Sequence, residues 1–298
     1  MIYTITTNPS LDYYLNLDEL KTGTMNRSEL ENYDAAGKGV NVSKFLDKLK
    51  INSVALGFLG GFTKEFYISL LCKYKHIQPQ FTSIRDNTRI NIKIKAKEET
   101  SLNAKGPNIT EEEFNKFMSR TTQIFDNDYV VFSGNIQDNL SDTIVSTIKN
   151  LINSNVRVIL DTDNKIVEKA CGFKPYLIKM DDLDIDMNEE NIISTGKKYI
   201  EMGVNYFLFS SAHSASYLFE DGCYYKCEHL KETHKTSTGT NDGMIAGILW
   251  SKLKGANSLE AFTYGNAVSA GVSLLDEVAN FKVINDLYDS IKIEKVKF

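Results

Sequence analysis

The chain has 298 residues, of which 42% are hydrophobic and 24% charged, a balance typical of a globular protein with a sizeable core. Its formal net charge of −5 argues against binding to nucleic acid or to a membrane surface, because both require a clustered positive field. The N-terminus has no basic start followed by a long apolar run, and no segment approaches about 18 apolar residues, so we expect a soluble, cytoplasmic protein.

The N-terminal third alternates short extended segments with small-residue turns. Strands are expected at residues 2–6 and 11–17, and residues 21–36 are polar and rich in turn-forming residues. Residues 35–49 form a small-residue turn that leads into an amphipathic helix, with Lys38 between two glycines. Glycine lets a ligand approach the backbone while the lysine charge reaches it, although an ordinary solvent-exposed lysine at a helix start fits equally.

A second strand-and-helix region follows. Residues 54–61 are expected to form a strand that ends at two glycines, 64–75 a helix and 110–125 another helix. Residues 88–96 alternate with period two, which predicts a half-exposed strand with a polar, basic face. Arg89 lies on that face, where it could be either a ligand-binding residue or a solvated strand charge.

The middle of the chain predicts the fold class. Strands are expected at residues 129–134, 156–162, 176–179 and 206–211, with helices at 140–153, 163–171 and 189–202 between them. This alternation predicts an α/β fold with a mostly parallel sheet covered by helices on both faces. Ligands bind beyond the carboxyl ends of such strands, where Ser133, Asp161, Lys179 and Ser210 lie. A hairpin about Asp221–Gly222, then helices from 243, over 258–275 and near 283–290, complete the chain. The four cysteines, Cys72, Cys171, Cys223 and Cys227, fit no common zinc spacing and are interpreted as free thiols.

Residues 236–250 carry the strongest sign of chemistry. Small polar residues give way to an apolar pattern at helical spacing, and the backbone N–H groups at such a helix start form an anion site. Asp242 lies where the small polar residues give way to the helical pattern, and its negative charge there would weaken the affinity for an anion. It makes sense there if it takes a proton from a hydroxyl while the N–H groups hold a phosphoryl group in transit. The alternative is an ordinary capped helix.

Two half-sites emerge from the candidate residues. The first comes from the N-terminal third and suits a sugar phosphate: Asp12, Arg27, Gly37, Lys38, Asn41 and Arg89. The second comes from the C-terminal half and suits a magnesium-bound phosphate: Lys179, Asp181, Asp184, Ser210, Ser211 and Gly239 to Asp242. Taken singly, an acidic run such as Asp181 to Asp186 is more often a solvated face.

The order of these pieces resembles the phosphofructokinase B (ribokinase-like) sugar kinases. The motifs in sequence are Asn8-Pro-Ser-x-Asp12, Ala36-Gly-Lys-Gly-x-Asn41, Gly57-Phe-Leu-Gly-Gly61, Thr88-Arg-Ile-Asn91, Ser133-Gly134, Asp161-Thr162, Lys179 and Gly239-x-x-Asp242. Within the family, the N-terminus and residues 88–95 look most like the 1-phosphofructokinases, with the tagatose-6-phosphate kinases next.

The resemblance implies a single kinase domain over residues 1–298, with a small β lid from about 11–35 and 88–104 that often pairs two subunits. It also implies ATP and Mg²⁺ and a role for each site residue. Asp242 would be the base, and the backbone of Gly239, Thr240, Asn241 and Asp242 the anion hole. Asp12, Gly37, Lys38 and Asn41 would hold the sugar, with Arg27, Arg89 and Lys38 on its phosphate. Lys179, Ser210, Ser211, Gly239 and Asn266 would line the ATP side, and Asp184, with Asp181, the magnesium.

The departures from the family pattern fall mainly on the nucleotide side. Asn241 replaces a glycine and is expected to take a positive φ, which asparagine tolerates better than most residues. Residues 210–215 lose the glycines that let the backbone approach a nucleotide.

We therefore hypothesise an ATP-dependent kinase of a ketohexose phosphate, with fructose 1-phosphate first and tagatose 6-phosphate second. The competing hypothesis is a degenerate kinase that binds a sugar phosphate without transferring phosphate. A neutral sugar or nucleoside as substrate is disfavoured, because the cations Arg27, Lys38 and Arg89 would have no partner.

Overall fold

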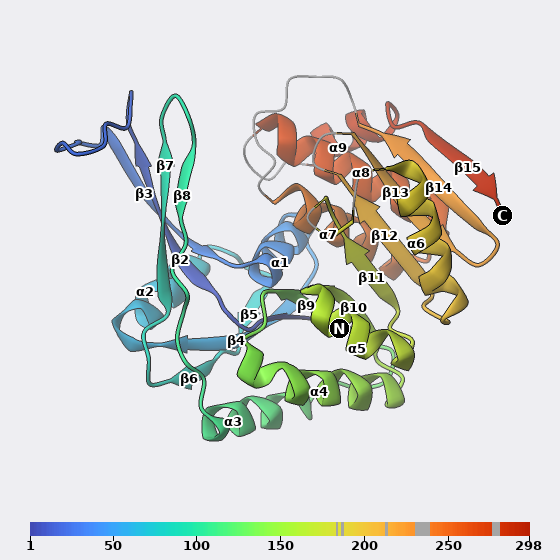
Figure 1. Ribbon diagram of the computed structural model, residues 1–298, viewed down its shortest axis with the longest axis horizontal. Coiled ribbons are helices and arrows are strands. Elements are labelled where there is room, and N and C mark those ends of the chain that lie inside the picture. The colour runs from blue at the N-terminus through green and yellow to red at the C-terminus, as the bar shows by residue number, and fades with distance from the viewer. Residues whose placement is uncertain (183, 186–187, 212–213, 230–238, 276–280) are drawn as a thin grey trace.

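The computed structural model describes residues 1–182, 184–185, 188–211, 214–229, 239–275 and 281–298. Most of its strands form one main sheet. The strands are β1 Ile2–Thr6, β4 Ser53–Gly60, β5 Ile77–Pro79, β6 Thr82–Ile84, β9 Tyr129–Gly134, β10 Arg157–Thr162, β11 Leu177–Met180, β12 Tyr206–Ser210, β13 Ala215–Glu220, β14 Cys223–Glu228 and β15 Ile293–Lys297. They lie in the order β15-β14-β13-β12-β11-β10-β9-β1-β4-β5, with β6 also paired to β4 (Figure 1).

The centre of the main sheet is parallel, as the alternation of strands and helices predicts. The pairs from β4 through β1, β9, β10 and β11 to β12 are all parallel, whereas β13, β14 and β15 add an antiparallel edge. Val130, Val131 and Phe132 of β9 are all buried although they point to alternate faces. Such continuous apolar runs are typical of strands covered on both faces.

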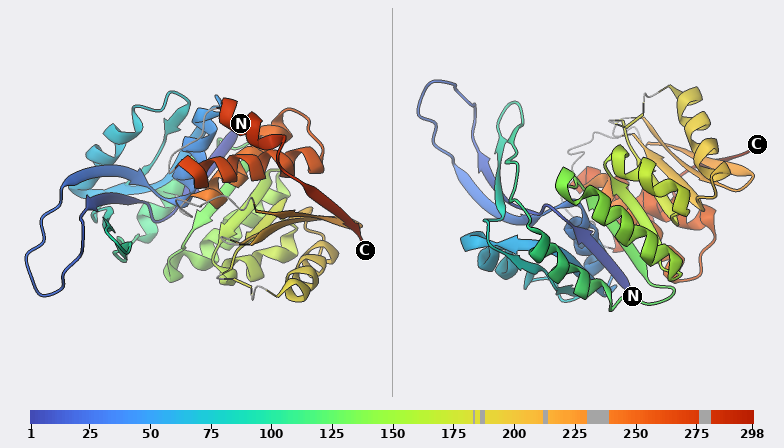
Figure 2. Two further views of the ribbon diagram at one scale, coloured as in Figure 1. Left: turned by 90° about the horizontal axis from the view of Figure 1, so that it is seen from above. Right: turned by 60° about the horizontal axis from the view of Figure 1, so that its bottom comes forward.

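Helices cover both faces. They are α1 Lys38–Lys48, α2 Gly61–Leu71, α3 Glu111–Thr121, α4 Ser141–Asn153, α5 Asn164–Ala170, α6 Glu189–Glu201, α7 Thr240–Leu253, α8 Ser258–Leu275 and α9 Phe281–Tyr288, with 3₁₀ turns at Asp138–Leu140 and Cys171–Phe173. Residues of α3, α4, α5 and α6 share one hydrophobic cluster with the sheet, and residues of α1, α7 and α8 share another. Figure 2 shows α3 to α5, in green, together on one face.

A second, small sheet stands apart from the main one (Figure 1, upper left). Its strands are β2 Ser10–Asn16, β3 Leu30–Ala36, β7 Arg89–Lys95 and β8 Thr100–Leu102, in the order β3-β2-β7-β8. These strands correspond closely to the segments 11–35 and 88–104 singled out from the sequence. The alternation predicted for β7 is present, but its polar residue Asn91 is 5% exposed and Ile90 is 37% exposed, so the polar face is turned inward.

Some elements differ from the sequence prediction. β3 lies in the segment interpreted as polar and turn-rich, because its pairing with β2 rather than an apolar pattern holds it in the sheet. β15 follows α9, where no further strand was expected, and its edge position leaves three of its five residues exposed. The four cysteines are free thiols, as interpreted. Among the described helices, none combines the length and the apolar character needed to cross a bilayer.

Candidate active site

Polar side chains stand where neighbouring parallel strands end. Ser133, Asp161, Lys179 and Ser210 lie at the carboxyl ends of β9, β10, β11 and β12, and all four are buried. This placement was expected from the sequence, because the carboxyl ends of parallel strands meet at one edge of the sheet. That edge is the floor of the candidate site.

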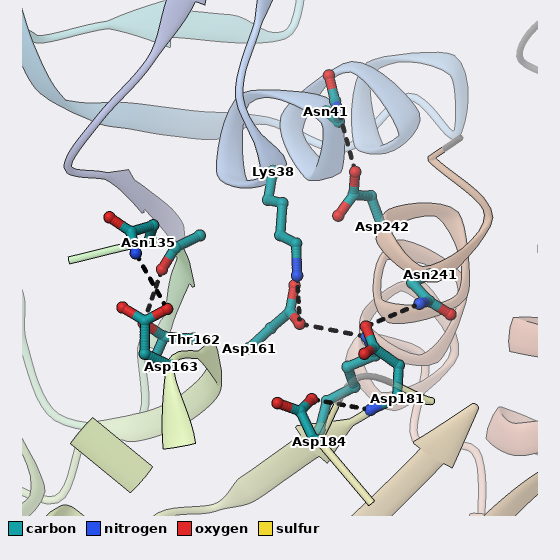
Figure 3. Close-up of polar contacts among 12 residues, drawn as sticks. Lys38, Asn41, Asn135, Asp161, Thr162, Asp163, Asp181, Asp184, Asn241 and Asp242 are labelled. Carbon is teal, nitrogen blue, oxygen red and sulfur yellow. Dashed lines mark hydrogen bonds and ion pairs between the residues drawn. The ribbon is translucent and has the colours of Figure 1, made fainter. Parts of the chain in front are cut away.

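Asp161 links two lysines that come from distant parts of the chain. Its Oδ1 accepts a hydrogen bond from Lys38 Nζ at 3.3 Å and lies 3.4 Å from Lys179 Nζ. Lys179, which is 1% exposed, also donates to Asp181 Oδ2 at 2.7 Å. Figure 3 shows Lys38 reaching from α1 to Asp161. Burial would lower the pKa of Lys38, but the charges of Asp161, Asp242 and Asp181 outweigh burial and raise the pKa above its ordinary value.

Asp242 lies in the first turn of α7 and is 4% exposed. Asn41 of α1 donates from Nδ2 to Asp242 Oδ2 at 2.9 Å, so the N-terminal and C-terminal parts of the chain meet here (Figure 3). Burial and the negative charge of Asp161 raise the pKa of Asp242 to about 7, although Asn41 and Lys38 act in the opposite direction. A carboxylate with this pKa is suited to act as a base near neutral pH.

The start of α7 is built around Gly239. Gly239 has φ 81° and directly precedes Thr240, the first residue of α7, and the first backbone bond of the helix runs from Gly243 N to Gly239 O at 2.9 Å. The N–H groups of this first turn lie at a helix start, where backbone N–H groups and the helix dipole together favour an anion. Residues 236–238 of the predicted loop lie outside the described residues.

The prediction that Asn241 takes a positive φ is wrong. Asn241 lies inside α7 and is not among the described residues with positive φ, whereas Gly239 is. The residue that needs glycine is thus the one just before the helix, and the asparagine occupies ordinary helical backbone. Its Nδ2 lies 3.5 Å from Asp181 Oδ2, which connects α7 to the end of β11.

Gly37 and Gly39, at the start of α1, pack directly against β1. A Cβ on Gly37, which has φ 139°, would lie 2.6 Å from Thr6 Cγ2, and a Cβ on Gly39 would lie 2.6 Å from Thr6 Oγ1. Thr6 Oγ1 in turn accepts from Val40 N at 3.1 Å. The close packing on β1 fixes the first turn of α1 and with it the direction of Lys38.

The small sheet supplies the opposite wall. Asp12, 6% exposed, accepts hydrogen bonds from Ser10 Oγ at 2.7 Å and Asn91 Nδ2 at 2.9 Å. A cleft of about 800 Å³ separates this sheet from the helix starts. Residues that line it include Asp12, Tyr14, Asn32, Asp34, Asn41, Lys44, Lys48, Lys73, Lys93, Lys95, Ser101 and Gly239. Asp12 and the glycine turn before α7 therefore face one cleft.

The predicted cation cluster of Arg27, Lys38 and Arg89 is not assembled. Arg89 pairs with Ser10 at the base of β2, and its guanidinium donates to the backbone oxygens of Asn8 and Ala104, both at 3.0 Å. Arg27 is exposed in the loop beyond Asn16, at the other end of β2, roughly 20 Å away along the strand. Neither arginine is among the residues that line the cleft.

The residues predicted for the ATP side are only partly open to a ligand. Ser210 ends β12, and Ser211 Oγ donates to Asp182 at 3.2 Å. Asn266 is buried within α8, where its Oδ1 accepts from Ser216 at 2.6 Å and its Nδ2 donates to Phe262 O at 2.9 Å. Both polar groups of Asn266 thus make hydrogen bonds inside the protein.

The carboxylates that follow β11 are candidate metal ligands. Asp184 Oδ2 accepts from Asp181 N at 3.0 Å, and burial raises the pKa of Asp184 above its ordinary value. Within the described residues, no three acidic, histidine or cysteine side chains converge to hold a metal. Asp161 Oδ2, however, is buried and has no partner in the described part of the chain. This donor set fits Mg²⁺, which keeps several waters and needs only one or two carboxylates besides a bound phosphate.

Asp161 is the residue whose role sequence reasoning missed. Its position at a strand end and the motif Asp161-Thr162 were recognised, but no function was given to it. The available signal was electrostatic: two lysines, Lys38 and Lys179, were both directed to the same edge and required a shared counter-charge.

Comparison with known proteins gives consistent matches over the whole chain. Residues 6–276 match the profile described as pfkB family carbohydrate kinase. The 1-phosphofructokinase of Bacillus subtilis (strain 168) is 31% identical over 99% of this chain and 100% of its own length. The D-tagatose-1-phosphate kinase of Bacillus licheniformis is 28% identical over 94% of this chain and 98% of its own. The structure of phosphofructokinase-2 from Escherichia coli in complex with fructose-6-phosphate covers 97% of this chain and 98% of its own with a TM-score of 0.90, and at 18% identity it shows a shared fold.

The Asp161 ion cluster predicts a stability effect. Asp161→Asn leaves Lys38 and Lys179 without their shared counter-charge and should lower the free energy of unfolding by about 3 kcal/mol in urea titrations. The matched control is Asp138→Asn, which removes an exposed 2.7 Å ion pair with Lys165 and should leave stability within error. Equal effects of the two substitutions would contradict the structural importance of Asp161.

Proposed function

The chain belongs to the pfkB family of carbohydrate kinases, and on that premise we propose that it transfers the γ-phosphoryl group of ATP to a hydroxyl of a ketohexose phosphate. The observation that carries the proposal is the position of Asp242. It is a buried carboxylate in the first turn of α7 and is bonded to Asn41, which lines a cleft whose opposite wall holds Asp12. Phosphoryl transfer mainly requires alignment and charge neutralisation, and these residues supply both.

Each wall has a distinct task in this mechanism. On the small sheet, Asp12 is held by Ser10 and Asn91 so that its free lone pairs can accept from sugar hydroxyls. On the opposite wall, Asp242 takes the proton of the reacting hydroxyl, and Asn41 keeps its carboxylate oriented. The backbone N–H groups of the first turn of α7 face the phosphoryl group as negative charge develops on it.

The charged side chains near the end of β11 are the basis for placing the nucleotide there. Lys179, held between Asp161 and Asp181, places a buried positive charge at the end of β11, where an ATP phosphate would lie. Asp161, Asp181 and Asp184 are the carboxylates that would hold Mg²⁺ directly or through water. When bound, the ion would neutralise phosphate charge. Gly37 and Lys38 complete the wall at the start of α1.

Fructose 1-phosphate is the acceptor we propose first, and tagatose phosphates second. The 1-phosphofructokinase and the tagatose-1-phosphate kinase both match nearly the whole chain, and the two sugars differ at one hydroxyl. The alternative, a non-catalytic sugar-phosphate binder, is motivated by the changes at residues 210–215 and at residues 239–242. The second motive is weakened, since Gly239 holds the positive φ and Asn241 is helical.

We also propose that the small sheet acts as a lid and as a dimer interface in a cytoplasmic enzyme. The face of this sheet opposite Asp12 carries apolar side chains that are exposed or half-exposed: Tyr13, Tyr33, Ile90, Ile92 and Leu102. Tyr13 and Tyr33 stack at 4.4 Å, and Phe66 of α2 meets Tyr33 at 5.3 Å. A contiguous exposed apolar patch of this kind favours self-association, and a two-fold contact would close it.

The function is tested by ADP release from the purified protein with fructose 1-phosphate, tagatose 6-phosphate and fructose 6-phosphate. Asp242→Asn should lower kcat by at least about 100-fold, because the hydroxyl loses its base, while calorimetric binding of the sugar phosphate stays nearly unchanged. Asp142→Asn, which alters an exposed first-turn aspartate of α4, is the control and should keep full activity. No turnover with any of the three sugars removes the proposal.

The pH dependence follows from the raised pKa of Asp242. Below about 7 its carboxyl is protonated and cannot accept a proton, so kcat/KM should rise roughly tenfold per pH unit and level off above neutrality. Lys38→Met should move the inflection to higher pH, because the charge of Lys38 lowers the pKa of Asp242. A profile that is flat from pH 5.5 to 8, after correction for titration of the substrate phosphate near about 6, would show that Asp242 is not the base.

The interface is tested by sedimentation. Ile90→Asp places a charge in the apolar face of the small sheet and should convert a dimer to a monomer. Met202→Asp at the end of α6, equally exposed at 37%, is the matched control and should not change the mass. A wild-type protein that sediments as a monomer at micromolar concentration would end this part of the proposal.

A further inference from the structure

The first turn of α7 directs two neighbouring side chains to two different half-sites. Consecutive residues of an α-helix point about 100° apart. Asp242 meets Asn41 of α1, whose Nδ2 lies 2.9 Å from Asp242 Oδ2. Asn241 instead extends toward Asp181 after β11, on the side where we place the nucleotide (Figure 3). The turn that presents the backbone N–H groups therefore carries a carboxylate toward the sugar side and an amide toward the nucleotide side.

The amide of Asn241 is held only loosely by its neighbour. Its Nδ2 lies 3.5 Å from Asp181 Oδ2, at the outer limit of a hydrogen bond. The same oxygen accepts a much shorter bond from Lys179 Nζ, at 2.7 Å. Because an amide nitrogen carries two N–H groups, Asn241 keeps donor capacity for a ligand. The residue is half-buried and its backbone is helical, so no special conformation accounts for an asparagine at this position.

The polar cluster that Asn241 faces is incomplete. Lys179 joins Asp181 to Asp161, whose Oδ1 lies 3.4 Å from the lysine Nζ. Asp161 is 2% exposed, and its Oδ2 has no hydrogen-bond partner in the described part of the chain. A buried carboxylate oxygen without a partner is costly, and a bound group that supplies the missing contact stabilises it. The cluster therefore indicates a ligand on the side of the turn to which Asn241 points.

We propose that Asn241 donates a side-chain hydrogen bond to the terminal phosphoryl group of ATP, beside the backbone N–H groups of the same turn. This inference rests on the proposed function and deepens it, because it gives the anion site a donor that the glycine of the family pattern does not have. A phosphoryl oxygen at normal hydrogen-bond distance is a stronger acceptor for this amide than Asp181 at 3.5 Å. The phosphoryl group is then held from the nucleotide side by Asn241, while Asp242 acts from the sugar side.

The test is steady-state kinetics of Asn241→Ala with ATP, Mg²⁺ and fructose 1-phosphate. Losing a hydrogen bond to a charged group should lower kcat/KM for ATP by about 10- to 100-fold. KM for fructose 1-phosphate should stay within about twofold of wild type, because Asn241 faces the nucleotide side. Asn241→Gln keeps the amide and should recover most of the loss. Asn150→Ala removes an exposed asparagine of α4 and should behave as wild type.

A second variant keeps the shape of the side chain. Asn241→Asp replaces the N–H donors with a carboxylate that repels phosphate, so it should lower kcat/KM for ATP at least as much as Asn241→Ala. The helix dipole favours an aspartate in a first turn, so this variant should fold, and thermal unfolding checks each protein. The proposal is overturned if Asn241→Ala, or Asn241→Asp where Asn241→Ala is unfolded, leaves kcat/KM for ATP within about twofold of wild type.

Calorimetry provides a readout that does not depend on turnover. Asn241→Ala should weaken the binding of β,γ-imido-ATP with Mg²⁺ by at least about fivefold, because the terminal phosphoryl group loses a donor. The binding of ADP with Mg²⁺ should change by less than about twofold, because ADP lacks that group. Equal weakening of both nucleotides would show that Asn241 acts on the site as a whole, which overturns the proposed contact.

Failure of the proposed function can be told apart from failure of this inference. If the wild type turns over no ketohexose phosphate, the same calorimetry decides. Binding of the ATP analogue that Asn241→Ala weakens, with ADP binding unchanged, supports the contact without the kinase reaction. Equal binding of the analogue to both proteins, or no binding to the wild type, rejects the contact.

Discussion

The candidate site depends on one shared counter-charge. Asp161 Oδ1 lies 3.3 and 3.4 Å from the ammonium groups of Lys38 and Lys179, which would otherwise repel each other. The same carboxylate raises the pKa of Asp242. A single strand-end residue therefore holds a lysine of each half-site and, together with burial, raises the pKa of the proposed base. Its second oxygen is buried and has no hydrogen-bond partner among the described residues.

Much of this arrangement can be predicted from sequence, and the reason is geometric. Alternating apolar strands and amphipathic helices predict a parallel sheet, and a parallel sheet brings its strand ends together. Ser133, Asp161, Lys179 and Ser210 were therefore placed correctly, and so was the helix start that carries Asp242. These inferences need only local patterns and the topology they imply.

Other features depend on contacts that local patterns do not contain. β3 has few apolar residues and exists because β2 pairs with it. Which glycine needs a positive φ depends on the exact start of α7, and a shift of two residues moved that requirement from Asn241 to Gly239. The arginines were grouped by charge and by the family resemblance, but strand register places Arg27 and Arg89 at opposite ends of β2. Strand pairing, which is a long-range property, decided the first and last of these cases, and the start of α7 decided the second.

The small sheet also has a consequence for the order in which the protein is made. All its strands end by Leu102, and the pairing of Ser10 with Arg89 closes it within the first third of the chain. During synthesis this wall can in principle assemble while the ribosome is still translating the segment that contains Asp242. The nascent chain would then expose a finished half of the cleft, with its apolar outer face, before its counterpart emerges. Cellular chaperones would meet this surface before the helix start that carries Asp242 emerges.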